Sequence, residues 1–173
     1  MIKKKNKGIV FWLTGLPGSG KTAISSHLIN NIQRKYGPTI LISGDDIRKI
    51  FHLNGYKKLD RLKIGKKYFE FCSFFSDQGF NVLINVVCLF KNIRKLNRLK
   101  LKNYIEIFIK TDIHQILSNN KKYFYKKKHA NVWGVDIRPE FPENPHILVI
   151  NNFDKNVKKL SNEIFLKIKN IFH

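Results

Sequence analysis

The chain has 173 residues, of which 43% are hydrophobic, and 33 Lys and Arg against 12 Asp and Glu give it a formal net charge of +21. This length predicts one folded domain, and no apolar run approaches the roughly 20 residues of a membrane helix. Because the basic start, residues 1–7, leads into no long apolar signal core, we expect a cytoplasmic protein without a membrane partner.

The positive charge has two interpretations. A large surplus of basic residues is typical of proteins that bind nucleic acids. The alternative is compositional bias, since lysine outnumbers arginine and the lysines are scattered along the chain. Arginine is the usual residue for reading base edges and phosphates. We therefore favour compositional bias and do not expect a nucleic-acid partner.

The first predicted strand, residues 9–13, leads into a segment that matches G-x-x-x-x-G-K-[ST], the phosphate-binding loop or P-loop. Apolar residues at helical spacing follow over 24–32, so the loop lies between a strand and a helix that starts at about Lys21. Gly15, Gly18 and Gly20 should allow positive φ and a close backbone approach, so that amide groups surround phosphate oxygens.

The loop residues have expected roles in binding ATP. The predicted phosphate-binding residues are Gly15, Leu16, Pro17, Gly18, Ser19, Gly20, Lys21 and Thr22. We expect Lys21 to reach the β- and γ-phosphates as a catalytic residue, and the Thr22 hydroxyl to bind the Mg²⁺ that accompanies ATP.

The second predicted strand, residues 39–43, ends in Gly44-Asp45-Asp46-Ile47-Arg48. Ligands of open α/β sheets bind at the carboxyl ends of the strands, so this acidic pair is a candidate site. Asp45 can accept a proton from an attacking hydroxyl or hold water on Mg²⁺. The alternative is structural: Asp45 or Asp46 caps a helix that begins near Ile47.

Further strands and helices alternate along the rest of the chain. A long helix is predicted from Asp60-Arg61 to about Gln78, ended by Gly79. Strands over 82–87, 104–109 and 146–150 alternate with helices over 93–101, 112–119 and 157–172. This order predicts an α/β protein: one three-layer P-loop NTPase domain over 1–173, with a five-stranded parallel sheet and helices on both faces.

Two features remain outside this alternation. Periodicity fails over about 120–144, a basic and aromatic stretch that is either a lid whose lysines neutralise phosphates or a solvated charged loop. Cys72 and Cys88 lie in or beside apolar stretches without C-x-x-C or zinc spacing, so we expect buried thiols.

Taken together, these segments resemble the adenylylsulfate (APS) kinases over nearly the whole chain. Residues 7–16 are similar to the family's entry into its phosphate loop, and residues 44–48 resemble its G-D-N-V-R segment. Asp60-Arg61 resembles the family's D-R pair. Residues 134–145 resemble its G-I-D…Y-E-x-P-E-N-P loop.

The resemblance implies a kinase that transfers the γ-phosphoryl group of MgATP to the ribose 3′-hydroxyl of adenylyl sulfate, giving PAPS and ADP in sulfate assimilation. Asp45 would be the base or the carboxylate that orients the hydroxyl. The implied acceptor-binding residues are Asp45, Arg48, Tyr56, Arg61, Lys122 and Trp133. Because family members are often dimers, a homodimer is one expectation.

Several positions depart from the family pattern. The lid motif R-D-x-K-G-L-Y is here residues 119–125, which keep the lysine as Lys122 but lack the Arg, Asp and Gly. The family's F-T-G, whose Phe stacks on the acceptor adenine, is here residues 132–134, so either Trp133 stacks instead or the base pocket differs. Residues 87–90 resemble the I-S-[LM]-F of a bacterial branch often met in surface-polysaccharide pathways.

Three functions follow from these observations. The leading one is APS kinase. The second keeps the phosphoryl transfer but uses another nucleotide acceptor, such as cytidine diphosphoramidate in capsule modification. The third is a non-catalytic relative that binds nucleotides or nucleic acids, against which the intact Lys21, Thr22 and Asp45 argue.

Overall fold

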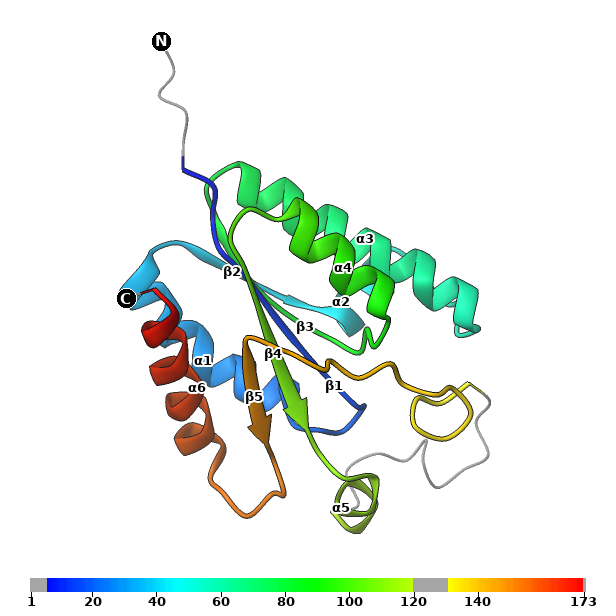
Figure 1. The fold of residues 1–173 in the computed structure, drawn as a ribbon. Helices are drawn as coiled ribbons and strands as arrows, with labels where there is room; N and C mark the ends of the chain where they lie inside the picture. The colour runs from blue at the N-terminus through cyan, green and yellow to red at the C-terminus, as the bar shows by residue number, and fades with distance from the viewer. Residues whose placement is uncertain (1–5, 120–130, 173) are drawn as a thin grey trace.

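The computed structural model describes residues 6–119 and 131–172 (Figure 1). Its centre is a five-stranded parallel sheet with the order β2-β3-β1-β4-β5. The strands are β1 (Val10–Gly15), β2 (Thr39–Ser43), β3 (Asn81–Val86), β4 (Tyr104–Lys110) and β5 (Ile147–Ile150). The predicted fold class is therefore confirmed.

Helices cover both faces of the sheet and complete the three layers (Figure 1). They are α1 (Lys21–Tyr36), α2 (Gly44–Ile50), α3 (Lys58–Asp77), α4 (Lys91–Lys100), α5 (Ile113–Ser118) and α6 (Val157–Ile171). Helices α1 and α6 pack on one face, and α3 and α4 pack on the other. No helix in the described ranges is both long and apolar enough to cross a lipid bilayer.

The central strand β1 explains why the apolar run predicts a buried strand. Val10 and Trp12 belong to the core beneath α3 and α4, whereas Phe11 and Leu13 belong to the core beneath α1 and α6. All four are fully buried. A strand covered on both faces is apolar at every position, so its sequence shows a continuous hydrophobic run. The P-loop consequently begins in the middle of the sheet's carboxyl edge.

The structure corrects the interpretation of the acidic pair as helix caps. Helix α2 begins at Gly44, its N-cap is Ser43, and no side chain caps it. Asp45 and Asp46 therefore lie within the first turn, where carboxylates complement the helix dipole. By contrast, Asp112 does cap α5, because its Oδ1 accepts a hydrogen bond from the backbone N–H of His114 at 2.6 Å.

The second half of the expected lid is a packed turn. The N–H of Val132 donates to Asp136 Oδ2 at 3.0 Å, and the N–H of Gly134 donates to the carbonyl of Ile137 at 3.0 Å. Glu140 then joins this segment to α4, since its Oε2 accepts from the N–H of Lys91 at 2.6 Å. Residues 131–144 are therefore held against the body of the protein. The first half of the expected lid, with Lys122, lies outside the described residues.

Both cysteines are buried thiols, as expected from their apolar surroundings. Burial raises the pKa of Cys88 to about 12, and it raises the pKa of Cys72 well above its ordinary value.

Candidate active site

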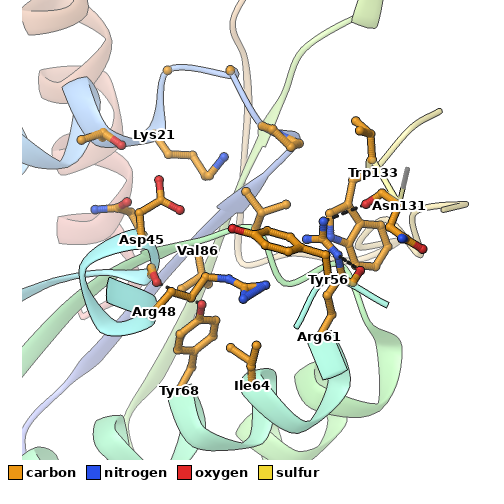
Figure 2. Close-up of a pocket in the computed structure, with 18 of the residues that line it drawn as sticks. Lys21, Asp45, Arg48, Tyr56, Arg61, Ile64, Tyr68, Val86, Asn131 and Trp133 are labelled. Carbon is orange, nitrogen blue, oxygen red and sulfur yellow. Dashed lines mark hydrogen bonds between the residues drawn. The ribbon is translucent and has the colours of Figure 1, made fainter. Parts of the chain in front are cut away.

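A cavity of about 690 Å³ opens at the carboxyl edge of the sheet (Figure 2). The P-loop, the start of α2, the start of α3, the end of β3 and residues 131–133 form its walls. The predicted site residues among its lining are Pro17, Gly18, Gly20, Lys21, Thr22, Asp45, Arg48, Tyr56, Arg61 and Trp133. The other loop residues, Gly15, Leu16 and Ser19, are buried behind this wall.

The glycines of the P-loop are required for two different reasons. Gly18 and Gly20 have φ values of 84° and 89°, which side-chain-bearing residues rarely adopt. Gly15 has φ 159°, which is also a value that side-chain-bearing residues rarely adopt, so the predicted positive φ is confirmed at all three glycines. A Cβ on Gly15 would lie 2.5 Å from the carbonyl oxygen of Ile109 on β4. The first glycine thus allows a close approach between neighbouring strands.

Lys21 begins α1, and its ammonium group is directed to the loop that precedes it. Nζ donates to the carbonyl oxygens of Leu16 at 2.7 Å and Gly15 at 3.1 Å, and it lies 3.3 Å from Ser19 Oγ. The residue is only 7% exposed. A cation held at a helix N-terminus and beside backbone amides is suited to phosphate oxygens.

Two asparagines that the sequence analysis did not single out support this wall of the cavity. Asn151, directly after β5, donates through Nδ2 to the carbonyl of Ser19 at 3.0 Å. Asn85, near the end of β3, donates through Nδ2 to Ser25 Oγ at 3.0 Å. Asn151 follows a predicted strand at the carboxyl edge, which is the signal that identified Asp45 and could have found Asn151 as well. Asn85 lies within its strand, where that signal does not apply.

Asp45 lies across the cavity from Lys21, on the first turn of α2 (Figure 2). The start of this helix is fixed by Tyr68, whose hydroxyl donates to the carbonyl of Gly44 at 3.1 Å. Burial raises the pKa of the Tyr68 hydroxyl well above its ordinary value, so it remains a neutral donor. The carboxylate is therefore carried by a rigid element.

Arg48 and Arg61 converge on the ring of Tyr56 (Figure 2). Their guanidinium carbons lie 4.6 Å and 5.3 Å from its centroid. Arg48 donates to the carbonyls of Leu53 at 2.6 Å and Gly55 at 2.9 Å, and these hydrogen bonds fix the turn that carries Tyr56. Cation–π contacts of this kind hold the three side chains together.

The two arginines form a concentrated positive charge. Among the described residues, no carboxylate forms an ion pair with either of them. Burial, and then the like charge of Arg48, lowers the pKa of Arg61 below its ordinary value. Positive charge without a protein counter-ion inside a cavity is the environment that an anionic ligand stabilises.

Trp133 forms the far wall of the cavity and is fully buried. Its ring packs edge-on against Phe90 with a centroid distance of 4.9 Å, and the guanidinium of Arg61 lies 5.8 Å from its ring. Arg61 also donates to the carbonyl of Asn131 at 2.7 Å. The indole thus fills a place between α3, the end of β3 and the turn, instead of projecting into the open part of the cavity.

The cavity also fits a magnesium ion that enters with ATP. Thr22 and Asp45 both line it, and hydroxyl and carboxylate oxygens are ligands that Mg²⁺ prefers. Within 6–119 and 131–172, no three His, Cys, Asp or Glu side chains are grouped as a metal cage. A site with few protein ligands is typical of Mg²⁺ that is bound largely through substrate phosphates.

A glycine loop with its lysine, facing a carboxylate and a cationic subsite across one cavity, defines the class of P-loop kinases. A family model described as adenylylsulphate kinase matches residues 7–150. The chain therefore belongs to the adenylylsulfate kinase family and is a nucleotide kinase.

Two relatives of this chain have different named activities. The cytidine diphosphoramidate kinase of Campylobacter jejuni is 37% identical over 167 residues, covering 94% of this chain and 97% of its own. The adenylyl-sulfate kinase of Clostridium kluyveri is 34% identical over 170 residues, covering 94% of this chain and 85% of its own.

A solved structure shows the same fold. The APS kinase of Mycobacterium tuberculosis in complex with AMPPNP and APS superposes with a TM-score of 0.84 at 20% identity, covering 94% of this chain and 98% of the other. The two chains therefore share their fold over almost their whole lengths.

Proposed function

We propose that this protein transfers the γ-phosphoryl group of MgATP to the ribose 3′-hydroxyl of a nucleotide acceptor. One observation carries the proposal: a single cavity has Lys21 and Thr22 on one wall and Asp45 opposite, and beyond it lie two arginines that have no carboxylate partner in the part of the chain that the structure describes. The donor phosphates, the hydroxyl and the anionic part of the acceptor each find a suitable group there.

The chain's contribution to the reaction is mainly alignment and charge neutralisation. The P-loop amides and Lys21 would bind the β- and γ-phosphates, and Lys21 would stabilise the charge on the transferring group. Thr22 would hold Mg²⁺, which supplies further charge neutralisation when it is bound. Asp45 would accept the hydrogen bond of the attacking hydroxyl and receive its proton.

The acceptor would bind through Arg48, Arg61 and Tyr56. A guanidinium group binds phosphate and sulfate oxygens through paired N–H donors, and both arginines are already fixed by backbone carbonyls. Tyr56, which is 54% exposed, offers a ring face to a base or ribose.

Cytidine diphosphoramidate is the acceptor that we place first, although the sequence motifs favour adenylyl sulfate. The Campylobacter jejuni relative supports this choice through its identity and its nearly equal length. The turn at residues 132–134 supports it too, because Val132 stands at the position of the family's stacking Phe, and the buried Trp133 packs on Phe90 instead of projecting into the open part of the cavity. The ring that would stack on an adenine is therefore not reproduced there. Adenylyl sulfate is the second candidate, supported by the Clostridium kluyveri relative.

The test is a comparison of kcat/KM for 3′-phosphorylation of the two acceptors with MgATP, with products identified by mass spectrometry. Cytidine diphosphoramidate is expected to be the better substrate. Preference for adenylyl sulfate would reverse the order of the two acceptors. Turnover of neither acceptor, together with tight, salt-sensitive RNA or DNA binding, would favour the non-catalytic alternative.

We place this reaction in the cytoplasm, where ATP is supplied. The two buried, unpaired thiols agree with a reducing compartment.

A further inference from the structure

Asn85 has no task in the reaction as proposed above, yet it occupies the reacting part of the cavity. It lies near the carboxyl end of β3 and is only 6% exposed. It lines the same cavity as Thr22 and Asp45. The inference drawn from it rests on the proposed function, since it concerns the ATP side of that site.

Hydrogen bonds on α1 determine which end of the Asn85 amide faces the cavity. The hydroxyl of Ser25 donates its single hydrogen to the carbonyl of Thr22 at 3.0 Å. Toward Asn85 it can therefore only accept, and Asn85 Nδ2 lies 3.0 Å from Ser25 Oγ. The amide nitrogen is thus directed to α1, which leaves the oxygen, Oδ1, for the cavity.

Oδ1 has no donor among the described protein groups and is available to a ligand in the cavity. None of the hydrogen bonds among the described residues reaches this oxygen. The oxygen does not belong to the fully buried side-chain atoms that lack a partner, so it is open to the cavity and to a donor that enters it. Asp45 and the phosphates of ATP are acceptors and cannot supply the bond, and the Lys21 ammonium is directed to the loop carbonyls.

We propose that Asn85 is a positioning residue whose Oδ1 accepts a hydrogen bond from water bound to the Mg²⁺ that accompanies ATP. Water on a divalent cation is a strong hydrogen-bond donor. Because the Asn85 amide is already held through Nδ2 by Ser25, its oxygen can accept this hydrogen bond without reorganisation. Through Ser25, two hydrogen bonds also link Asn85 to the backbone of Thr22, the expected magnesium ligand.

The test is calorimetric binding of ADP in the presence of Mg²⁺ and in the presence of EDTA, without any acceptor nucleotide. In the wild type, Mg²⁺ is expected to tighten binding. In Asn85→Leu, the ratio of ADP affinity with Mg²⁺ to ADP affinity with EDTA is expected to be about tenfold smaller than in the wild type, which is the size of one charge-assisted hydrogen bond. The metal-free affinity is expected to be unchanged. A gain equal to that of the wild type would overturn the proposal.

A matched control lies on the same strand. Asn81, at the opposite end of β3, is also buried and binds the carbonyl of Tyr36 and the N–H of Ile9. Asn81→Ala is expected to lower the melting temperature but to keep the magnesium-dependent gain. Loss of the gain in this variant too would mark the effect of Asn85 as general destabilisation and overturn its assigned role.

A second variant keeps the proposal testable if Asn85→Leu does not fold. Asn85→Asp retains an acceptor oxygen of similar shape, and the Ser25 hydroxyl can turn to donate to it. Its magnesium-dependent gain is expected to equal or exceed that of the wild type, and a smaller gain would overturn the proposal. A folded wild type that binds neither ADP nor ATP would instead contradict the proposed kinase function.

Discussion

At the scale of single residues, Lys21 and Asp45 are fixed by different means. The Lys21 ammonium is bound by oxygens of its own loop, so its direction is set by the backbone. Asp45 depends on the start of α2, which Tyr68 fixes through the carbonyl of Gly44. Each can therefore be replaced without removing the group that positions the other.

Lys21→Ala is expected to lower kcat by two to three orders of magnitude, because a preorganised donor to the transferring phosphoryl is lost. Steady-state kinetics with the preferred acceptor measures the effect, and circular dichroism checks the fold. Lys35→Ala, an exposed change in the last turn of the same helix, is the control and should keep wild-type kinetics. Near-normal turnover of the Lys21 variant would refute its assigned role.

Asp45→Asn is expected to retain ATP binding and to lose most of kcat, since an amide cannot take the proton of the attacking hydroxyl. Calorimetry with ATP and single-turnover kinetics separate binding from transfer. Asp46→Asn is the matched control, because Asp46 is the next residue of α2 and lies outside the cavity lining. If Asp45→Asn weakened ATP binding as strongly as transfer, Asp45 would be a metal or structural group.

At the scale of elements, a buried ionic network joins β4 to α4 and to the segment that returns toward β5. Glu106, 1% exposed at its side chain, lies 3.3 Å from Arg94 Nε and 2.7 Å from Arg98 Nη2. The same arginines donate to the carbonyls of Phe141 and Asn144. The network thereby holds the segment that follows the turn at Trp133.

Glu106→Gln is expected to lower the free energy of unfolding by about 3–5 kcal/mol, because it leaves the charge of Arg94 buried without a counter-ion. Urea denaturation followed by fluorescence measures this change. Glu163→Gln, which removes the exposed partner of Lys155, should cost no more than about 1 kcal/mol. Equal small losses in both variants would show that the buried pair contributes little.

The helices, the strands and their contacts differ in how far the sequence alone predicts them. Apolar runs predicted all five strands of the described sheet: the central strands are covered on both faces, and the partly exposed edge strands β2 and β5 are apolar as well. The start of α2 was placed too late, since the capping preference of aspartate suggested a boundary that backbone geometry sets at Ser43. Glu106 and Arg94 lie on different elements, and Asn151 and Ser19 come from distant segments, so no local pattern encodes either pairing.

At the scale of the whole molecule, only one of the two hydrophobic cores contains the thiols. Cys72 and Cys88 both belong to the core beneath α3 and α4, and neither is accessible. Their reactivity therefore reports on the integrity of that half of the protein.

Neither thiol of the native protein is expected to react with DTNB at pH 8, because burial both blocks access and raises the pKa of Cys88 to about 12. Two thiols should react after unfolding in guanidinium chloride. Absorbance at the thionitrobenzoate band gives the count. Rapid reaction of either thiol without denaturant would contradict the packing of α3 described above.

The parallel sheet separates the cavity from both ends of the described chain. Residue 7 enters β1 at the edge opposite the P-loop, and Phe172 packs on Tyr36 at the far end of α1. The 16-residue helix α1 lies between that contact and Lys21, a span of about 24 Å at 1.5 Å per residue (Figure 1). An affinity tag or a surface linker fused at either end would thus leave the mouth of the cavity open, so immobilised protein is suited to screening nucleotide libraries.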